Sequence, residues 1–311
     1  MTNKIDLHIH TTSSDGTKTP TEVLQEAESL GLETIAITDH ESVGAYPEII
    51  ANRKFFSGNM IPGIELKTIC NKREIELLGY GIDIAKMRAL LPEYYQEKTQ
   101  LNYEYLKAII ATLRQKGIKI SEDLPKYYVD RMVQPATFVT NALKDDKENY
   151  SYNHECLLDD TFPHQGKSGL YREWFSNPES RFFVDFEFYP KYAEVMQLIK
   201  DCDGLVFIPH IYQYAKMSDS ILQKLLESNG IDGIECFYPT FSPEQSTYLE
   251  NLAKEKGLFI SGGSDYHGAN KKNLLGRGLP DNLYIDEEYI KPWTEEILAK
   301  EEPGLRLTRK I

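Results

Sequence analysis

Two short polar pairs near opposite ends of the chain limit the fold more than any other feature of the sequence. His8 and His10 interrupt an apolar run at the start of the chain, and Asp265 and His267 follow an apolar run and a glycine turn near its end. Residues i and i+2 of an extended segment point to the same side, so each pair can serve one site. The pairs predict that the first and last strands of one closed sheet meet at a metal centre.

Apolar strands that end in polar residues alternate with helices in the first and last thirds of the chain. The expected strands cover residues 5–10, 34–40, 60–65, 75–80, 204–210, 233–238 and 258–261. Helix starts are expected at Thr19-Pro20 and near Pro243, because a capping hydroxyl and an early proline favour the first helical turn. Strand, polar end, helix and strand form the pattern of a β/α barrel, whose chemistry gathers at the carboxyl ends of the strands. The sequence therefore predicts an α/β barrel with one polar rim.

The alternation stops in the middle of the chain, which is rich in tyrosine, charge and helical periodicity. We expect residues 91–191 to form an inserted, mostly helical subdomain that covers the rim, a candidate substrate lid whose tyrosines mainly pack. The barrel then comprises residues 1–90 and 192–282, and an acidic tail, 283–311, packs on it. His154 and His164 fall in the insertion and are expected to be surface residues.

Composition limits the class of partner. The 311 residues include 35 basic and 48 acidic side chains, a net charge of −13, which argues against a duplex nucleic-acid partner. A nucleotide substrate remains compatible, because bound divalent cations would supply local positive charge. The four cysteines lack any Cys-x-x-Cys spacing, and no apolar run reaches the roughly 18 residues of a membrane span. We expect a soluble, cytoplasmic protein with no membrane partner, in an oligomeric state that the sequence leaves open.

Nine side chains at or just beyond the expected strand ends are candidate metal ligands. They are His8, His10, Asp15, His40, Glu65, Glu76, His210, Asp265 and His267. One transition metal takes about four to six donors, so the set indicates two or three divalent ions, and mixed imidazole and carboxylate donors suit manganese, iron or zinc. Two ions about 3.5–4 Å apart can hold a bridging hydroxide and neutralise a leaving group. This arrangement predicts phosphoester hydrolysis by in-line attack of that hydroxide.

Each part of this pattern also has a purely structural interpretation. In that interpretation, His210 is a buried core histidine and Asp265 caps the turn after its strand. Five of the seven histidines lie at strand ends, however, and this concentration favours a shared metal centre. Within it, His210 or His267 is expected to protonate the leaving oxygen, and Asp265 is expected to be essential for catalysis.

Several of these motifs occur together and in order. They are Asp6-Leu-His8-Ile-His10-Thr-x-x-Ser-Asp15-Gly, Ile-Thr-Asp39-His40, Pro-Gly-Ile-Glu65, the histidine at His210, Gly-Ile-Glu235 and Gly-Gly-Ser-Asp265-x-His267-Gly. Over about residues 3–90 and 192–276 they resemble the polymerase and histidinol phosphatase (PHP) superfamily. The resemblance implies a distorted, TIM-like (β/α)7 barrel with a trinuclear metal site.

The resemblance also implies a ligand set for each metal. It gives His8, His10, Glu65 and Asp265 to the first, Glu65 and His210 to the second, and Asp15, His40 and His267 to the third. Relatives usually carry a histidine at the position of Glu76, in a strand of the form Val-His-Leu-Leu-Gly. Glutamate at this position keeps a ligating group but adds negative charge.

The insertion and the phrase Gly-Ile-Asp-Gly-Ile-Glu-Cys-Phe-Tyr-Pro resemble the branch with nucleoside 3′,5′-bisphosphate phosphatases and exonucleases acting on short RNA. That branch commonly carries Arg-Pro-His or Arg-Thr-His where this chain has Gln134-Pro135-Ala136. A phosphate clamp uses a cation, so Arg131 and Lys167 are candidate substrate-binding residues, although each also suits a solvated surface charge.

The predicted function is therefore metal-dependent hydrolysis of a phosphate monoester on a small metabolite. A nucleotide such as a nucleoside 3′,5′-bisphosphate, or a short RNA end, is the favoured substrate. A histidinol-phosphate-type or sugar phosphatase is one alternative, and a non-catalytic metal-binding or partner-binding barrel is the other.

Overall fold

The computed structural model describes residues 3–95, 98–128, 135–144, 174–175, 177–185, 189–279, 282–299 and 305. The chain divides into two compact units. The first comprises Met1–Thr68, Ile75–Leu91 and Lys191–Ile311, and the second comprises Ile69–Glu74 and Pro92–Pro190. Within the described ranges, none of the helices combines the length and the apolar character needed to cross a membrane.

A seven-stranded sheet forms the centre of the first unit. Its strands, in spatial order, are β1 (Ile5–Ile9), β2 (Thr34–Ile37), β3 (Asn59–Cys70), β4 (Arg73–Tyr80), β5 (Leu205–Ile208), β6 (Gly233–Phe237) and β7 (Phe259–Gly262). Strands β1 to β3 pair in parallel, as do β5 to β7. Ile9 pairs with Tyr266 just beyond β7, and the His10 N–H donates to the Tyr266 carbonyl at 2.8 Å. The first and last strands therefore meet, and the predicted α/β, TIM-like barrel is confirmed.

The third and fourth strands depart from the expected alternation. Strand β3 does not end at Glu65 but continues to Cys70, and a two-residue turn at Asn71 and Lys72 leads directly into β4. Both turn residues have positive φ, 51° and 60°, as tight hairpin turns require. Strand β4 consequently runs antiparallel to β5. Glu76, expected near a strand end, lies inside β4.

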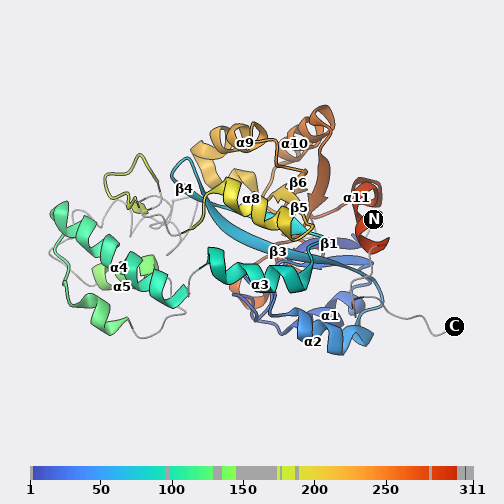
Figure 1. Ribbon diagram of the computed structural model, residues 1–311, viewed down its shortest axis with the longest axis horizontal. Coiled ribbons are helices and arrows are strands. Elements are labelled where there is room, and N and C mark those ends of the chain that lie inside the picture. Colours follow the sequence, from blue (N-terminus) through green and yellow to red (C-terminus); the bar gives the residue numbers. More distant parts are fainter. Residues whose placement is uncertain are drawn as a thin grey trace. The chain divides into compact units, whose positions relative to one another are not determined.

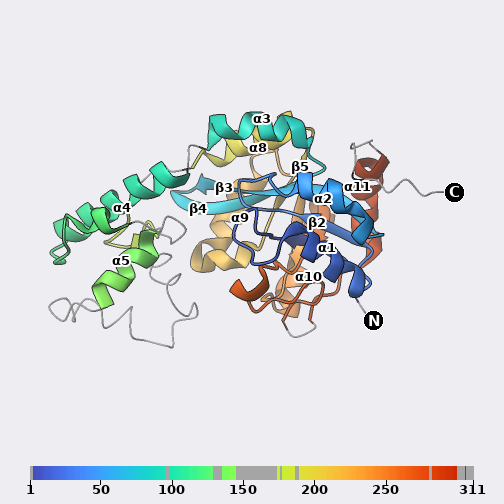
Figure 2. The same ribbon diagram turned by 90° about the horizontal axis from the view of Figure 1, so that it is seen from below.

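Helices surround the strands of the first unit (Figure 1 and Figure 2). They are α1 (Pro20–Ser29), α2 (Tyr46–Asn52), α3 (Ile84–Tyr94), α8 (Tyr192–Asp201), α9 (Ser218–Leu226) and α10 (Pro243–Lys256), with short 3-10 turns η1 (Arg53–Phe55), η5 (Ile211–Met217) and η6 (Gly268–Asn270). The expected start of α1 is observed because Thr19 and Glu22 form a reciprocal capping box beside Pro20. Ser242 and Gln245 begin α10 in the same way.

An apolar cluster in the first unit draws on every strand. Its buried members include Ile5, Leu7, Ala36, Ile61, Leu78, Tyr80 and Phe207, together with Leu283, Ile285, Ile290, Trp293 and Ile297 from the C-terminal segment, and the partly buried Phe237 and Phe259 pack against them. Trp293 belongs to α11 (Glu287–Ala299), and its indole N–H donates to the Ile260 carbonyl at 3.1 Å. Its ring lies 5.3 Å from that of Tyr80 and 5.0 Å from that of Phe207, centroid to centroid. Helix α11 therefore packs on the barrel core.

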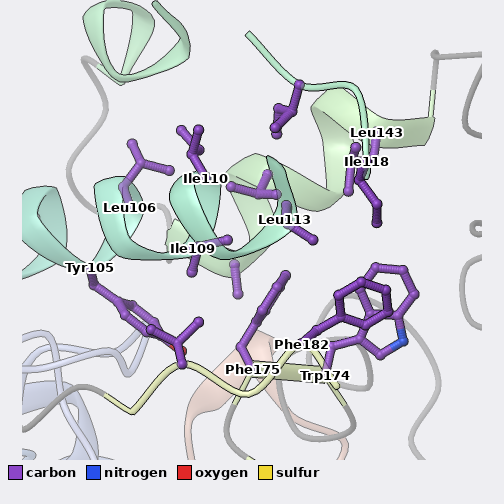
Figure 3. Close-up of a cluster of buried hydrophobic side chains, with 14 of the residues drawn as sticks. Tyr105, Leu106, Ile109, Ile110, Leu113, Ile118, Leu143, Trp174, Phe175 and Phe182 are labelled. Atoms are coloured by element: carbon purple, nitrogen blue, oxygen red, sulfur yellow. The ribbon is translucent and has the colours of Figure 1, made fainter. Parts of the chain in front are cut away.

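The second unit has a hydrophobic core of its own (Figure 3). In the ranges that the structure describes, this unit contains the helices α4 (Lys98–Gln115), η2 (Leu124–Tyr127) and α5 (Pro135–Lys144). Residues spaced three or four apart on α4, such as Leu106, Ile109 and Leu113, pack in one cluster with Trp174 and Phe182, whose rings stack at 4.2 Å. Helical periodicity thus buries one face of α4.

Candidate metal centre

The polar strand ends converge on Glu65, a carboxylate in β3 that is 1% exposed. The Nε2 atoms of His8 and His10 each lie 3.1 Å from Glu65 Oε2. His40 Nδ1 lies 3.3 Å from the same oxygen, and His210 Nε2 lies 2.8 Å from the other, Oε1. Imidazoles from β1 and from the ends of β2 and β5 therefore surround a single carboxylate.

Asp265 supplies a second buried carboxylate on the β7 side of the rim. Its Oδ1 lies 3.3 Å from His267 Nδ1, 3.4 Å from His10 Nε2 and 3.6 Å from His8 Nε2. The Asp265 backbone has a φ of 52°, a conformation that costs energy for residues other than glycine and that clusters at functional sites. With this backbone conformation in the turn after β7, the Asp265 carboxylate faces the three histidines.

Asp15 and Glu76 approach the same histidines from two other segments. Asp15 Oδ1 lies 3.2 Å from His267 Nε2, and its Oδ2 lies 3.8 Å from His40 Nε2. Glu76 Oε2 lies 3.4 Å from His210 Nε2. Leu78 pairs with Phe207 across β4 and β5, so Glu76 lies beside the carboxyl end of β5 although it is inside its own strand. The structure thus brings all nine candidate side chains together.

Eight of these nine side chains, all except His210, form groups whose donor atoms all lie within 4.8 Å of one another. The groups are His8, His10, Glu65 and Asp265; His10, Asp15, His40 and His267; and His40, Glu65 and Glu76. Two ligands of one transition metal, each about 2.1 Å from the ion, lie roughly 3–3.5 Å apart. The observed nitrogen-to-oxygen distances fall around this value, so the clusters are able to hold divalent metal.

The buried imidazole nitrogens provide a second test of this fit. His10 Nδ1 and Nε2, His40 Nδ1, His210 Nδ1 and His267 Nε2 are buried and have no hydrogen-bond partner among the described residues. Leaving a buried polar atom unpaired costs about 1–3 kcal/mol. A bound cation would satisfy such nitrogens, and so the donor set suits a metal better than it suits an apolar core.

Charges at the rim shift the pKa values of its groups. Burial opposes ionised carboxylates, but neighbouring imidazoles keep the pKa of Asp15 and Glu65 below its ordinary value. Burial also opposes a charged His10, yet the nearby carboxylates of Asp265 and Glu65 raise the pKa of His10 to about 9. Burial and the His10 charge lower the pKa of His267. The carboxylates are therefore ionised and able to bind a cation. A bound cation would displace the proton that His10 holds.

Glu235 was not among the sequence-predicted site residues. Its Oε1 lies 2.9 Å from His8 Nδ1, and its Oε2 accepts a hydrogen bond from the His210 backbone N–H at 2.7 Å. A carboxylate that fixes the second ring nitrogen of a ligating histidine sets its tautomer and orientation. The signal was present in the sequence, because Glu235 lies in the apolar strand 233–238 near its polar end.

A glycine allows β7 to approach β1 closely at the rim. A Cβ added at Gly263 would lie 2.3 Å from His8 Cβ and 2.5 Å from the His8 backbone nitrogen. Residue 263 must therefore be glycine for the two ends of the chain to meet.

Several predicted residues lie outside the described part of the chain. These are Arg131, Gln134, His154, His164 and Lys167. Ala136 is described, and it is a buried member of the apolar core of the second unit.

Three curated relatives each match at least 85% of this chain. A 5′-3′ exoribonuclease from Haemophilus influenzae is 28% identical over 94% of this chain and 99% of its own length. A phosphoribosyl 1,2-cyclic phosphate 1,2-diphosphodiesterase from Eggerthella lenta is 24% identical over 85% of this chain and 94% of its own. A 3′,5′-nucleoside bisphosphate phosphatase from Chromobacterium violaceum is 24% identical over 85% of this chain and 87% of its own length.

The fold has a solved counterpart, and a family model matches most of the chain. The crystal structure of a candidate metal-dependent phosphoesterase from Bifidobacterium adolescentis superposes with a TM-score of 0.62 at 22% identity, over 93% of this chain and 95% of its own. The model of the PHP domain matches residues 6–234. The predicted family resemblance is confirmed, and so is the prediction of a metal-dependent phosphoric ester hydrolase. The chain belongs to the PHP-domain family of phosphoesterases.

Proposed function

We propose that this protein is a metal-dependent phosphatase that removes a phosphate from a nucleotide, with a nucleoside 3′,5′-bisphosphate as the favoured substrate. One observation carries the proposal. Nine imidazole and carboxylate side chains converge at one end of the barrel, and several of their buried nitrogens lack partners among the described residues. Such a donor set is suited to charge neutralisation at a phosphoryl group.

The proposed ligands follow the sets that the sequence resemblance implies. They are His8, His10, Glu65 and Asp265 for one ion, Glu65, Glu76 and His210 for a second, and Asp15, His40 and His267 for a third. The proposed ions are two or three of manganese, iron or zinc. When bound, they polarise phosphoryl oxygens and activate water for in-line attack. Glu65 lies against four imidazoles, which supports its role as a shared ligand.

His210 and His267 are the proposed proton donors to the leaving oxygen. Burial opposes a charged His210, but the hydrogen bond to Glu65 and its charge raise the pKa of His210. The pKa of His267 is lowered instead. His210 therefore holds a proton at neutral pH more readily, and it is the better acid wherever its Nε2 is not bound to metal.

The substrate class is supported by the names of the relatives and by the charge of the chain. Two of the relatives carry names that concern nucleoside phosphates or RNA, so a nucleotide or a short RNA end is favoured over histidinol phosphate or a sugar phosphate. The net charge of −13 favours a small substrate over duplex nucleic acid.

We also propose the domain division that the sequence suggests, with a barrel of residues 1–90 and 192–282, an insertion of 91–191 and a tail of 283–311. The two compact units and the separate apolar core of the second support it. Under this proposal the barrel carries the chemistry.

Phosphate release from adenosine 3′,5′-bisphosphate with added Mn²⁺ tests the function. Wild type is compared with His8→Ala, and Glu255→Ala on α10 serves as a surface control. Parallel assays use histidinol phosphate and a short RNA with a 5′-phosphate. Release from the bisphosphate that requires His8 would support the proposal. Release only from histidinol phosphate would mean that histidinol phosphate, and not a nucleotide, is the substrate. Bound metal without release from any ester would favour the non-catalytic alternative.

A further inference from the structure

Lys271 lies beside the candidate metal centre but does not belong to its donor set. It follows η6, the short turn after His267, and this loop is fixed at several points. The Asn270 side chain donates to the Asp15 carbonyl at 2.7 Å, and Asn273 donates to the Ser264 carbonyl at 2.7 Å. The position of Lys271 is thus set by the same segments that position the ligands.

The ammonium of Lys271 contacts the outer oxygen of the Asp265 carboxylate. Its Nζ lies 2.6 Å from Oδ2, and the Tyr238 hydroxyl donates to the same oxygen at 2.7 Å. The inner oxygen, Oδ1, faces His8, His10 and His267. One carboxylate therefore separates the Lys271 ammonium from the atoms that would hold the metal.

The exposure of this ion pair is uneven. The Lys271 side chain is 38% exposed, whereas that of Asp265 is only 2% exposed. By contrast, the surface pair of Lys86 and Asp203 has both partners about half exposed, at 49% and 57%. Part of the Lys271 side chain therefore reaches solvent beside the buried carboxylate of the metal centre.

Lys271 is a cation at neutral pH, because the ordinary pKa of a lysine side chain is about 10.4. A lysine ammonium is a compact point charge with three donors, so it can keep its contact with Asp265 and donate to a second acceptor at the same time.

We propose that Lys271 binds a phosphoryl oxygen of the substrate and supplies the cation that holds the phosphate beside the metal centre. This inference rests on the proposed phosphatase function and extends it. The charge on the equatorial oxygens of a transferring phosphoryl group is stabilised by fixed cations. Lys271 provides one from the barrel itself, on the loop that carries Asp265 and His267.

The test compares wild type with Lys271→Met, Lys271→Arg and the control Lys272→Met, which removes the neighbouring exposed lysine. Binding of inorganic phosphate to the Mn²⁺-loaded proteins is measured by calorimetry, bound manganese by elemental analysis, and kcat/KM with adenosine 3′,5′-bisphosphate. We expect Lys271→Met to weaken phosphate binding by about 10- to 100-fold, as for the loss of a hydrogen bond to a charged group. The value of kcat/KM should fall by about 10²- to 10³-fold.

At saturating Mn²⁺, manganese content should match wild type in Lys271→Met even though one donor to Asp265 Oδ2 is lost. Lys271→Arg should recover part of the loss of phosphate binding, and Lys272→Met should bind phosphate as wild type does. Unchanged phosphate binding in Lys271→Met would overturn the proposal. A loss of manganese in proportion to the loss of phosphate would also overturn it, because Lys271 would then only position Asp265. If wild type hydrolyses no ester but phosphate binding still depends on Lys271, the proposed function fails and only the phosphate-binding role of Lys271 stands.

Discussion

The carboxylate of Glu76 faces the imidazole of His210, with 3.4 Å between Oε2 and Nε2. Through this contact Glu76 adds an oxygen donor to one side of the rim. The group of His40, Glu65 and Glu76 is rich in oxygen donors, whereas the group containing His10, His40 and His267 is rich in nitrogen donors. Oxygen donors suit manganese and magnesium, and imidazole suits zinc.

Replacing Glu76 by histidine should therefore shift the metal preference toward zinc. After dialysis against equal concentrations of Mn²⁺ and Zn²⁺, elemental analysis should find a higher zinc-to-manganese ratio in Glu76→His than in wild type. Glu255→His, on the exposed face of α10, is the matched control. The same ratio in all three proteins would mean that Glu76 does not contact the ion.

Tyr238→Phe should weaken metal binding without unfolding the protein. The lost hydroxyl donates to Asp265 Oδ2 at 2.7 Å, and loss of a group that orients a metal ligand typically costs about 10- to 100-fold in affinity. Metal dissociation constants from competition with a chelating dye would measure the effect. Tyr248→Phe removes a hydroxyl from a tyrosine that is 54% exposed and should bind metal as wild type does. Equal affinities in both variants would contradict the prediction.

Gly263→Ala should destabilise the barrel where its two ends meet. The added Cβ would lie 2.3 Å from His8 Cβ, and overpacking of this kind costs about 1–3 kcal/mol. Urea unfolding should show this loss in the free energy of unfolding. Gly44→Ala is the control, because its nearest atom is the Ser42 hydroxyl oxygen at 3.1 Å, at the end of a side chain that can rotate. A wild-type midpoint for Gly263→Ala would mean that β1 and β7 can separate without cost.

Metal affinity should rise with pH between about 6 and 8.5, by roughly tenfold per pH unit for each histidine proton that the ion displaces. The pKa of His10 is raised to about 9, and the pKa values of His8 and His210 are also raised above the ordinary histidine value, so these ligands hold protons in the absence of metal that the ion must displace. The pKa values of Asp15, Glu65 and Asp265 are lowered, so these carboxylates stay ionised and add no slope. Calorimetric titration with Mn²⁺ in two buffers of different ionisation enthalpy would count the released protons. An affinity independent of pH would mean that none of these ligand histidines holds a proton in the metal-free protein.

Much of the barrel could be predicted from local patterns in the sequence. The starts of α1 and α10 follow from capping residues and prolines that act within one turn, and the apolar runs give the strands. The direction of β4 could not be predicted this way. An apolar run indicates a strand but not its direction, and the two residues of the turn at Asn71 and Lys72 decided it.

The sequence by itself determined the chemistry of the rim, because the nine candidate side chains could be recognised by type and by their place near strand ends. Only the tertiary structure decided how they meet: that Glu65 lies among four imidazoles, that Glu76 reaches His210 from inside an antiparallel strand, and that Glu235 and Lys271 stand beside the centre. Strand periodicity acts between neighbours along the chain, whereas these contacts join residues distant in sequence, which only closure of the barrel brings together.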